Sequence, residues 1–167
     1  NAAWVLAIAP ALAFLNFAGM LPEIAAGSVV TGGYAWVPSF NLSFSWFIDG
    51  LSLTFALLIT GIGFLIVLYA GGYMKGHPQQ GRFLSFLLLF MGAMLGVVVS
   101  DSLMMLFVYW ELTSITSFLL IGFDHERAAS RRAALQALVV TGGGGLFLLA
   151  GLIFIWNMSG VTQLSIL

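Results

Sequence analysis

The chain has 167 residues, of which 61% are hydrophobic and only 7% are charged. A soluble domain carries about 25% charged residues, so this chain has too few charges to cover a water-facing surface. The composition therefore indicates an all-α polytopic membrane protein. Continuous rather than alternating apolar runs argue against a transmembrane β-barrel. The net charge of −1 gives no reason to expect a nucleic-acid partner, and the absence of cysteine excludes disulfides and thiolate metal sites.

Five apolar segments reach the length of about 20 residues that a membrane-spanning helix needs. The predicted helices cover about 3–20, 49–73, 83–100, 103–123 and 133–156. The chain starts at Asn1 rather than at Met, and its first apolar run lacks the basic segment of a signal peptide. We therefore expect residues 1–167 to form a single partial membrane domain of a larger bundle.

The segment from 25 to 45 has a different character, because glycine and proline alternate there with β-forming residues. The run GSVVTGGYAWVP (27–38) predicts a short β-hairpin that turns at Thr31-Gly32-Gly33. Irregular backbone facing lipid cannot satisfy its hydrogen bonds. The hairpin is therefore expected at the membrane surface.

The charged residues predict how the helices are oriented. With five spans, the loops 74–82 and 124–132 lie on the same side of the membrane, and together they hold all the basic residues of the chain. By the positive-inside rule that side is cytoplasmic, and the hairpin is extracytoplasmic. The basic residues are Lys75, Arg82, Arg127, Arg131 and Arg132.

One ionisable side chain falls inside a predicted span, in VYWELTSITSFLLIG (108–122). Glu111 would lie near the membrane midplane, where a carboxylate costs at least a few kcal/mol unless it is paired, protonated or wetted. Thr113, Ser114 and Ser117 extend the polar surface around it. An acid of this kind can relay protons, or it can be permanently neutralised by a bond between helices.

No Lys, Arg or His lies within the spanning part of any predicted helix. Glu111 therefore either takes a cationic partner from outside this chain or is protonated at rest.

Three further polar positions have open alternatives. Asp101 precedes the fourth predicted helix and can cap its N-terminus, or it can contribute to an outer ion entrance. Asp49 can cap the second helix in the same way. His125, in the cluster Asp124-His125-Glu126-Arg127, is either a solvated anchor or a group that hands protons toward a channel. The cluster is too compressed to predict a metal site.

Four consecutive glycines, Gly142 to Gly145, interrupt the fifth predicted helix. They can allow close helix packing or form a bendable point. They do not form a phosphate-binding loop, because they sit in an apolar run without the Lys-Ser/Thr that such a loop needs. No cofactor is expected.

Two longer runs, DGLSLTFALLITGIGFLIVLYAGGYM (49–74) and LLLFMGAMLGVVVSDSLMMLFVYWELTSITSFLLIGF (87–123), resemble the antiporter-like membrane subunits shared by respiratory complex I and the Mrp-type multisubunit sodium/proton antiporters. The resemblance covers about 70% of the chain. It implies a bundle of inverted five-helix repeats, of which this chain would supply about the second to sixth helix. Glu111 matches the acid of the family's fifth helix, held to pair with a lysine that would lie beyond Leu167.

Within this family, the runs are most similar to the large A subunit of the Mrp branch. Gln136 and the four glycines stand where complex I relatives tend to carry a Lys and an Arg-x-Gly-Asp run. The resemblance thus implies a subunit of a hetero-oligomeric Na⁺/H⁺ antiporter in the bacterial cytoplasmic membrane, a secondary transporter rather than an enzyme. A proton-pumping subunit of a quinone oxidoreductase and a purely structural scaffold are the alternatives.

Overall fold

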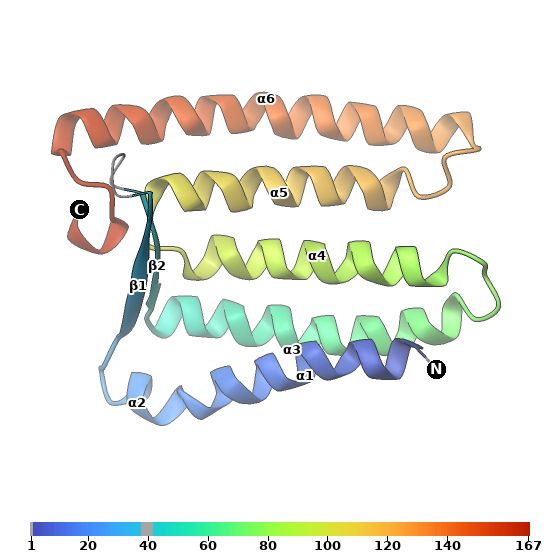
Figure 1. Cartoon of the computed structure of the whole chain (residues 1–167), viewed down its shortest axis with the longest axis horizontal. Helices are drawn as coiled ribbons and strands as arrows, with labels where there is room; N and C mark the ends of the chain where they lie inside the picture. The colour runs from blue at the N-terminus through green and yellow to red at the C-terminus, as the bar shows by residue number, and fades with distance from the viewer. Residues whose placement is uncertain (1, 38–41) are drawn as a thin grey trace.

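The computed structural model describes residues 2–37 and 42–167 of the chain. It contains five long helices, a two-stranded sheet and two short helical turns (Figure 1). The long helices are α1 (Ala2–Gly19), α3 (Gly50–Tyr73), α4 (Gln80–Val99), α5 (Leu103–Ile121) and α6 (Ala128–Ser159). The short elements are α2 (Leu21–Ala25), β1 (Val30–Val37), β2 (Leu42–Ile48) and the 3₁₀ turn η2 (Leu164–Ile166).

The long helices lie side by side, each antiparallel to the one before it (Figure 1). α1 packs on α3, α3 on α4, α4 on α5 and α5 on α6, so that α1 and α6 lie at opposite edges of the row. All five are long and apolar enough to cross a membrane. The prediction of an all-α membrane fold with five spans and a small β-hairpin is confirmed.

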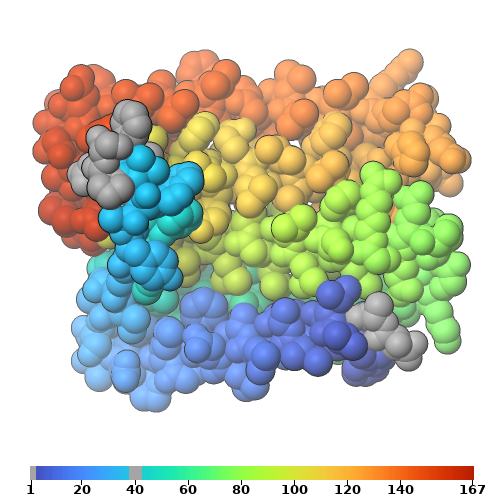
Figure 2. Space-filling model, viewed as in Figure 1, coloured from blue at the N-terminus to red at the C-terminus, as the bar shows by residue number. Residues whose placement is uncertain are grey.

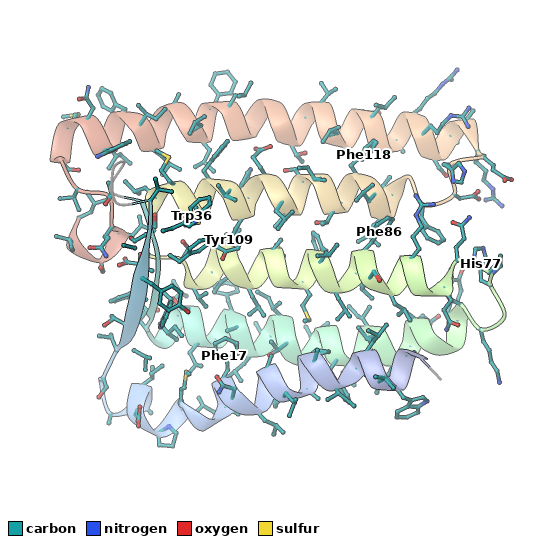
Figure 3. All side chains as sticks on the ribbon, in the orientation of Figure 1. Phe17, Trp36, His77, Phe86, Tyr109 and Phe118 are labelled. Atoms are coloured by element: carbon teal, nitrogen blue, oxygen red, sulfur yellow. The ribbon has the colours of Figure 1, made fainter. Side chains whose placement is uncertain are left out.

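Glycines on the helices allow neighbouring elements to approach closely. A methyl group at Gly71 of α3 would overlap Ala3 of α1, and one at Gly96 of α4 would overlap the ring of Tyr109 on α5. Figure 3 shows Tyr109 between these two helices. Small residues at such contacts are typical of membrane helices, which associate through close packing rather than through the hydrophobic effect.

Many large apolar side chains are exposed on the surface of this row of helices. Fully buried side chains are few, and residues such as Phe147, Tyr73 and Val139 are more than 70% exposed. Apolar surface of this extent has to be covered by lipid or by other protein. The row of five helices is consistent with an integral membrane protein and not with a water-soluble domain.

The predicted hairpin exists, but its turn was predicted in the wrong place. β1 and β2 pair antiparallel, and Thr31, Gly32 and Gly33 lie inside β1, opposite Phe47, Trp46 and Ser45. The link between the strands, residues 38–41, is outside the described residues. Gly32 does not form the turn. It leaves room for Trp46 on the opposite strand, because a side chain at residue 32 would overlap the indole of Trp46.

The hairpin lies across the ends of the helices at which α6 finishes (Figure 2). Val30 and Trp46 pack with a small cluster around Ile24, Ile48 and Leu53. The hairpin is thereby fixed to the helices through buried apolar contacts.

Helix ends differ from the predictions by a few residues. α4 begins at Gln80 and α6 at Ala128, earlier than the apolar runs suggested, and α6 continues to Ser159. Their first turns are polar, so hydrophobicity alone could not locate them. α6 ends where Gly160 adopts a positive φ of 69°, which glycine tolerates at helix C-termini.

The predicted cap at Asp49 is confirmed, since its carboxylate accepts a hydrogen bond of 2.8 Å from the Ser52 amide. This bond is the main reason that the pKa of the Asp49 carboxyl is lowered below its usual range.

Candidate functional site

Glu111 is the ninth of the nineteen residues of α5 and therefore lies near the middle of the helix. Its side chain is partly buried, and the carboxylate oxygen Oε1 is buried without any hydrogen-bond partner among the described residues. A buried polar atom without a partner costs roughly 1–3 kcal/mol. A protein retains such an atom at a cost in stability, so Glu111 requires an explanation beyond packing.

Oε1 of Glu111 is directed at α6, where it lies against Gly145. A Cβ atom built on Gly145 would overlap this oxygen and would lie 3.1 Å from the carboxyl carbon of Glu111. The same Cβ would come within 3.7 Å of the Trp110 ring. The carboxyl group therefore occupies space between α5 and α6 that exists only because residue 145 has no side chain.

The hydroxyl groups predicted to surround Glu111 bond mostly to their own helix. Thr113 donates to the Trp110 carbonyl at 2.7 Å, and Ser114 donates to the same carbonyl at 3.4 Å. Thr116 donates to the Leu112 carbonyl at 2.7 Å. The bonds of Thr113, Ser114 and Thr116 direct their protons along the helix rather than toward the carboxylate, which explains how these polar groups are accommodated in an apolar helix. Ser117 is partly buried one helical turn further on.

Asp101 is bound to the segment that follows α6, and it does not cap α5. The cap is Ser102, whose hydroxyl accepts a hydrogen bond from the Met105 amide. Asp101 is only 4% exposed, and its two carboxylate oxygens accept bonds of 2.8 and 2.9 Å from the amide and the hydroxyl of Ser165. The prediction of an Asp101 cap is therefore wrong. Its carboxylate joins two segments that are 64 residues apart in the sequence.

Backbone bonds complete the attachment of this segment. The Asp101 carbonyl accepts from the Leu164 amide at 2.7 Å, and the Leu103 amide donates to the Thr162 carbonyl at 2.9 Å. On the other side, the Asp101 amide donates to the carbonyl of Ser45 in β2 at 2.9 Å. The turn before α5 thus lies between the hairpin and the chain that follows α6.

His125 lies at the opposite end of the row, beyond the end of α5. It is exposed, and its carbonyl accepts from the Arg131 guanidinium at 2.6 Å. The neighbouring Asp124 forms an exposed ion pair with Arg127 at 2.8 Å. All the basic residues lie at this end, next to the loop that carries His77 (Figure 3).

The predicted site residues therefore lie at three levels along the direction of α5. About 12 Å of helix separates the start of α5 from Glu111, and about 15 Å separates Glu111 from its end, at 1.5 Å per residue. Asp101 lies at the first end, Glu111 at the middle and His125 beyond the second end. Sequence reasoning missed Gly145 and Ser165 as their contacts, although the run of four glycines marked the region of α6 that meets Glu111.

Two family models match the chain and together cover more than two thirds of it. The model for the N-terminus of NADH-ubiquinone oxidoreductase (complex I) chain 5 matches residues 35–84. The model for the transmembrane region of NADH:quinone oxidoreductase and the Mrp antiporter matches residues 100–167, which include Glu111 and Gly145. The chain belongs to this antiporter-like family.

Curated members of the family include sodium/proton antiporter subunits. The chain is 47% identical over 152 residues to Na⁺/H⁺ antiporter subunit A1 of Staphylococcus haemolyticus (strain JCSC1435), and 45% identical to that of Staphylococcus aureus. Each alignment covers 91% of this chain and 19% of the relative. The chain thus spans about a fifth of the length of these antiporter subunits.

Two solved structures contain a similar arrangement of helices. The Mrp complex from Dietzia sp. DQ12-45-1b matches 98% of this chain and 17% of its own chain, with a TM-score of 0.81 and 28% identity. The membrane-bound sulfane sulfur reductase, an archaeal respiratory membrane complex, matches 95% of this chain and 32% of its own, with a TM-score of 0.79 and 22% identity. The latter likeness concerns the fold alone.

Proposed function

We propose that this chain is the proton-conducting part of a subunit of a Na⁺/H⁺ antiporter complex, and that Glu111 relays the proton. The observation that carries the proposal is the buried Oε1 of Glu111, in the middle of a membrane-spanning helix, which has no hydrogen-bond partner in residues 2–37 and 42–167. Acids at this depth are costly and are usually functional. The 47% identity to an antiporter subunit supports sodium and protons as the transported ions.

Glu111 would work by exchanging its proton for a cationic neighbour. Without a cation nearby, the neutral carboxylic acid is favoured, because an unpaired carboxylate in the membrane costs a few kcal/mol. When a cation approaches, the carboxylate form is stabilised and the proton leaves toward water or the next acceptor. We propose that a lysine of the full-length protein, on a helix outside these five, supplies this cation.

The proposed setting is the bacterial cytoplasmic membrane. The two basic loops 74–82 and 124–132 lie at the same end of the row and would face the cytoplasm by the positive-inside rule. The hairpin would then face outward, with Asp101 behind it. The exposed apolar faces of the helices would be covered by lipid and by the other subunits of the complex.

The test is Glu111→Gln in the full-length antiporter, measured as proton movement driven by added sodium in inverted membrane vesicles. Glutamine keeps the size of glutamate, but its amide does not bind and release a proton near neutral pH. Antiport should fall at least about 100-fold, while the amount of assembled complex stays unchanged. The matched control is Glu126→Gln, which changes an exposed acid and should leave antiport intact.

A proton-pumping subunit of a quinone oxidoreductase is the second candidate, because one matching family model describes complex I chain 5. Under that function, proton release would follow quinone reduction and would not respond to sodium. A structural scaffold predicts instead that Glu111→Gln is neutral or stabilising, with antiport retained. Full antiport by Glu111→Gln would therefore refute the relay.

A further inference from the structure

The four glycines of α6 are not equivalent in the structure. A Cβ atom added at Gly142, Gly143 or Gly144 would meet no described residue within 4 Å, apart from its chain neighbours and the backbone of the helix itself. At Gly145 it would overlap the Glu111 carboxylate. The first three glycines therefore leave open space, and the fourth makes room for one particular side chain.

Gly145 is also the buried member of the run. Gly144 is exposed, and Gly142 and Gly143 are partly buried. Glycine inside a helix is destabilising relative to alanine, yet α6 continues through all four positions without a break. At residue 145 alone, the described contacts give a reason why alanine would not be preferred.

The space at Gly145 determines where the Glu111 carboxylate can be. α5 has α4 on one side and α6 on the other. Toward α4, the preceding turn is filled by the ring of Tyr109 against Gly96. Toward α6, Oε1 lies directly against Gly145. A methyl group on residue 145 would therefore force the carboxylate out of the interface between α5 and α6.

We propose that Gly145 is a positioning residue for the Glu111 relay: its missing side chain forms a notch that holds the carboxylate between α5 and α6. The inference rests on the proposed function of Glu111 and assigns the geometry of that site. A proton carrier must hold its carboxylate within reach of a partner, and displacement by about 1 Å can reduce a rate by about 100-fold. The notch fixes this position from the neighbouring helix.

The experiment compares Gly145→Ala with Gly144→Ala in the full-length antiporter. Both substitutions add one methyl group to the same turn of α6 and raise helix propensity equally. Sodium-driven proton movement should fall about 10-fold to 100-fold in Gly145→Ala and stay within about twofold of the parent in Gly144→Ala, for equal amounts of assembled complex. Equal activity of the two variants would overturn the proposal.

A second comparison separates positioning from general damage to the helix contact. Glu111→Asp shortens the acid by one methylene group, which frees about the volume that the methyl group at residue 145 takes. The double variant Glu111→Asp/Gly145→Ala should therefore be as active as Glu111→Asp alone, within about twofold, whereas independent effects would multiply. If the double variant is a further 10-fold less active in antiport than Glu111→Asp, the positioning role of Gly145 is refuted.

The two proposals can fail separately. Full antiport by Glu111→Gln refutes the relay, because glutamine fits the same notch. Loss of antiport in Glu111→Gln, with no coupling between residues 111 and 145, leaves the relay in place and refutes the role of Gly145.

Discussion

The two acids on either side of the first half of α5 differ in how their oxygens are satisfied. Asp101 is almost fully buried, and both of its carboxylate oxygens accept hydrogen bonds from Ser165. Glu111 has a buried oxygen that lies against Gly145 and has no hydrogen-bond partner in the described part of the chain. The sequence places Asp101 at a turn between two spans and Glu111 inside a span, and the structure shows that their contacts differ as well.

The difference is consistent with a structural role for Asp101 and with the relay proposed for Glu111. The two hydrogen bonds from Ser165 hold the Asp101 carboxylate in one place, because a movement of the carboxylate would break them. The buried Oε1 of Glu111 accepts no such bond among the described residues, so a carboxylate at this position is costly until a cation approaches it. Asp101 therefore suits an attachment between chain segments, and Glu111 suits transport.

The largest effect on stability is expected from Asp101→Ala. Removing the carboxylate leaves the amide and hydroxyl of Ser165 without their acceptor and should destabilise the protein by about 3 kcal/mol. Thermal unfolding of the purified complex would measure it. Ser165→Ala removes one of the two bonds and should cost about 1 kcal/mol. If the Asp101→Ala protein is as stable as the parent, the Asp101 carboxylate does not have the structural role that distinguishes it from Glu111.

An effect of opposite sign is expected from Glu111→Met. Methionine has a similar length and no polar atom, so it relieves the unpaired Oε1 and should stabilise the protein by about 1–2 kcal/mol. Antiport should be lost in the same variant. The same unfolding measurement applies, and a loss of stability would show that Glu111 has a partner that holds it in place.

The smallest effect concerns Asp49, an acid that is satisfied but not buried. Asp49→Ala removes the cap of α3 and should cost about 1 kcal/mol at pH 7. The Ser52 amide lowers the pKa of the Asp49 carboxyl. The contribution of Asp49 to folding stability is therefore complete above about pH 4, and it is lost as the pH falls through the lowered pKa.

Asp49→Asn provides the control, because asparagine can cap a helix but does not titrate there. Melting temperatures at pH 7 and pH 3 should show a drop from this group in the parent and none in Asp49→Asn. An equal drop in both proteins would assign the acid sensitivity to other groups.

The five spans could be predicted because membrane helices need long apolar runs, and this sequence has little else. The starts of α4 and α6 were placed too late because their first turns are polar. The hairpin was also predicted, but its turn was not. Gly32 and Gly33 are typical turn residues, whereas in β1 they make room for Trp46 and Ser45 across the sheet.

The site was predicted in part for the same physical reasons. Glu111 stands out because it is an acid in an apolar run, and no contact is needed to notice it. Its notch at Gly145 and the bond from Ser165 to Asp101 join residues 34 and 64 positions apart. Pattern and spacing cannot specify such pairs, so Asp101 was assigned to the nearest helix end, and the glycines were assigned either to close helix packing or to a bendable point without a named partner.

The bond between Asp101 and Ser165 also has a consequence for biogenesis. A ribosome adds about 5–20 residues per second, so Ser165 is made about 3–13 s after Asp101. During that interval α5 and the whole of α6 are synthesised while the aspartate lacks its donors. Asp101 therefore gains these two donors only after the last of the five long helices has been synthesised.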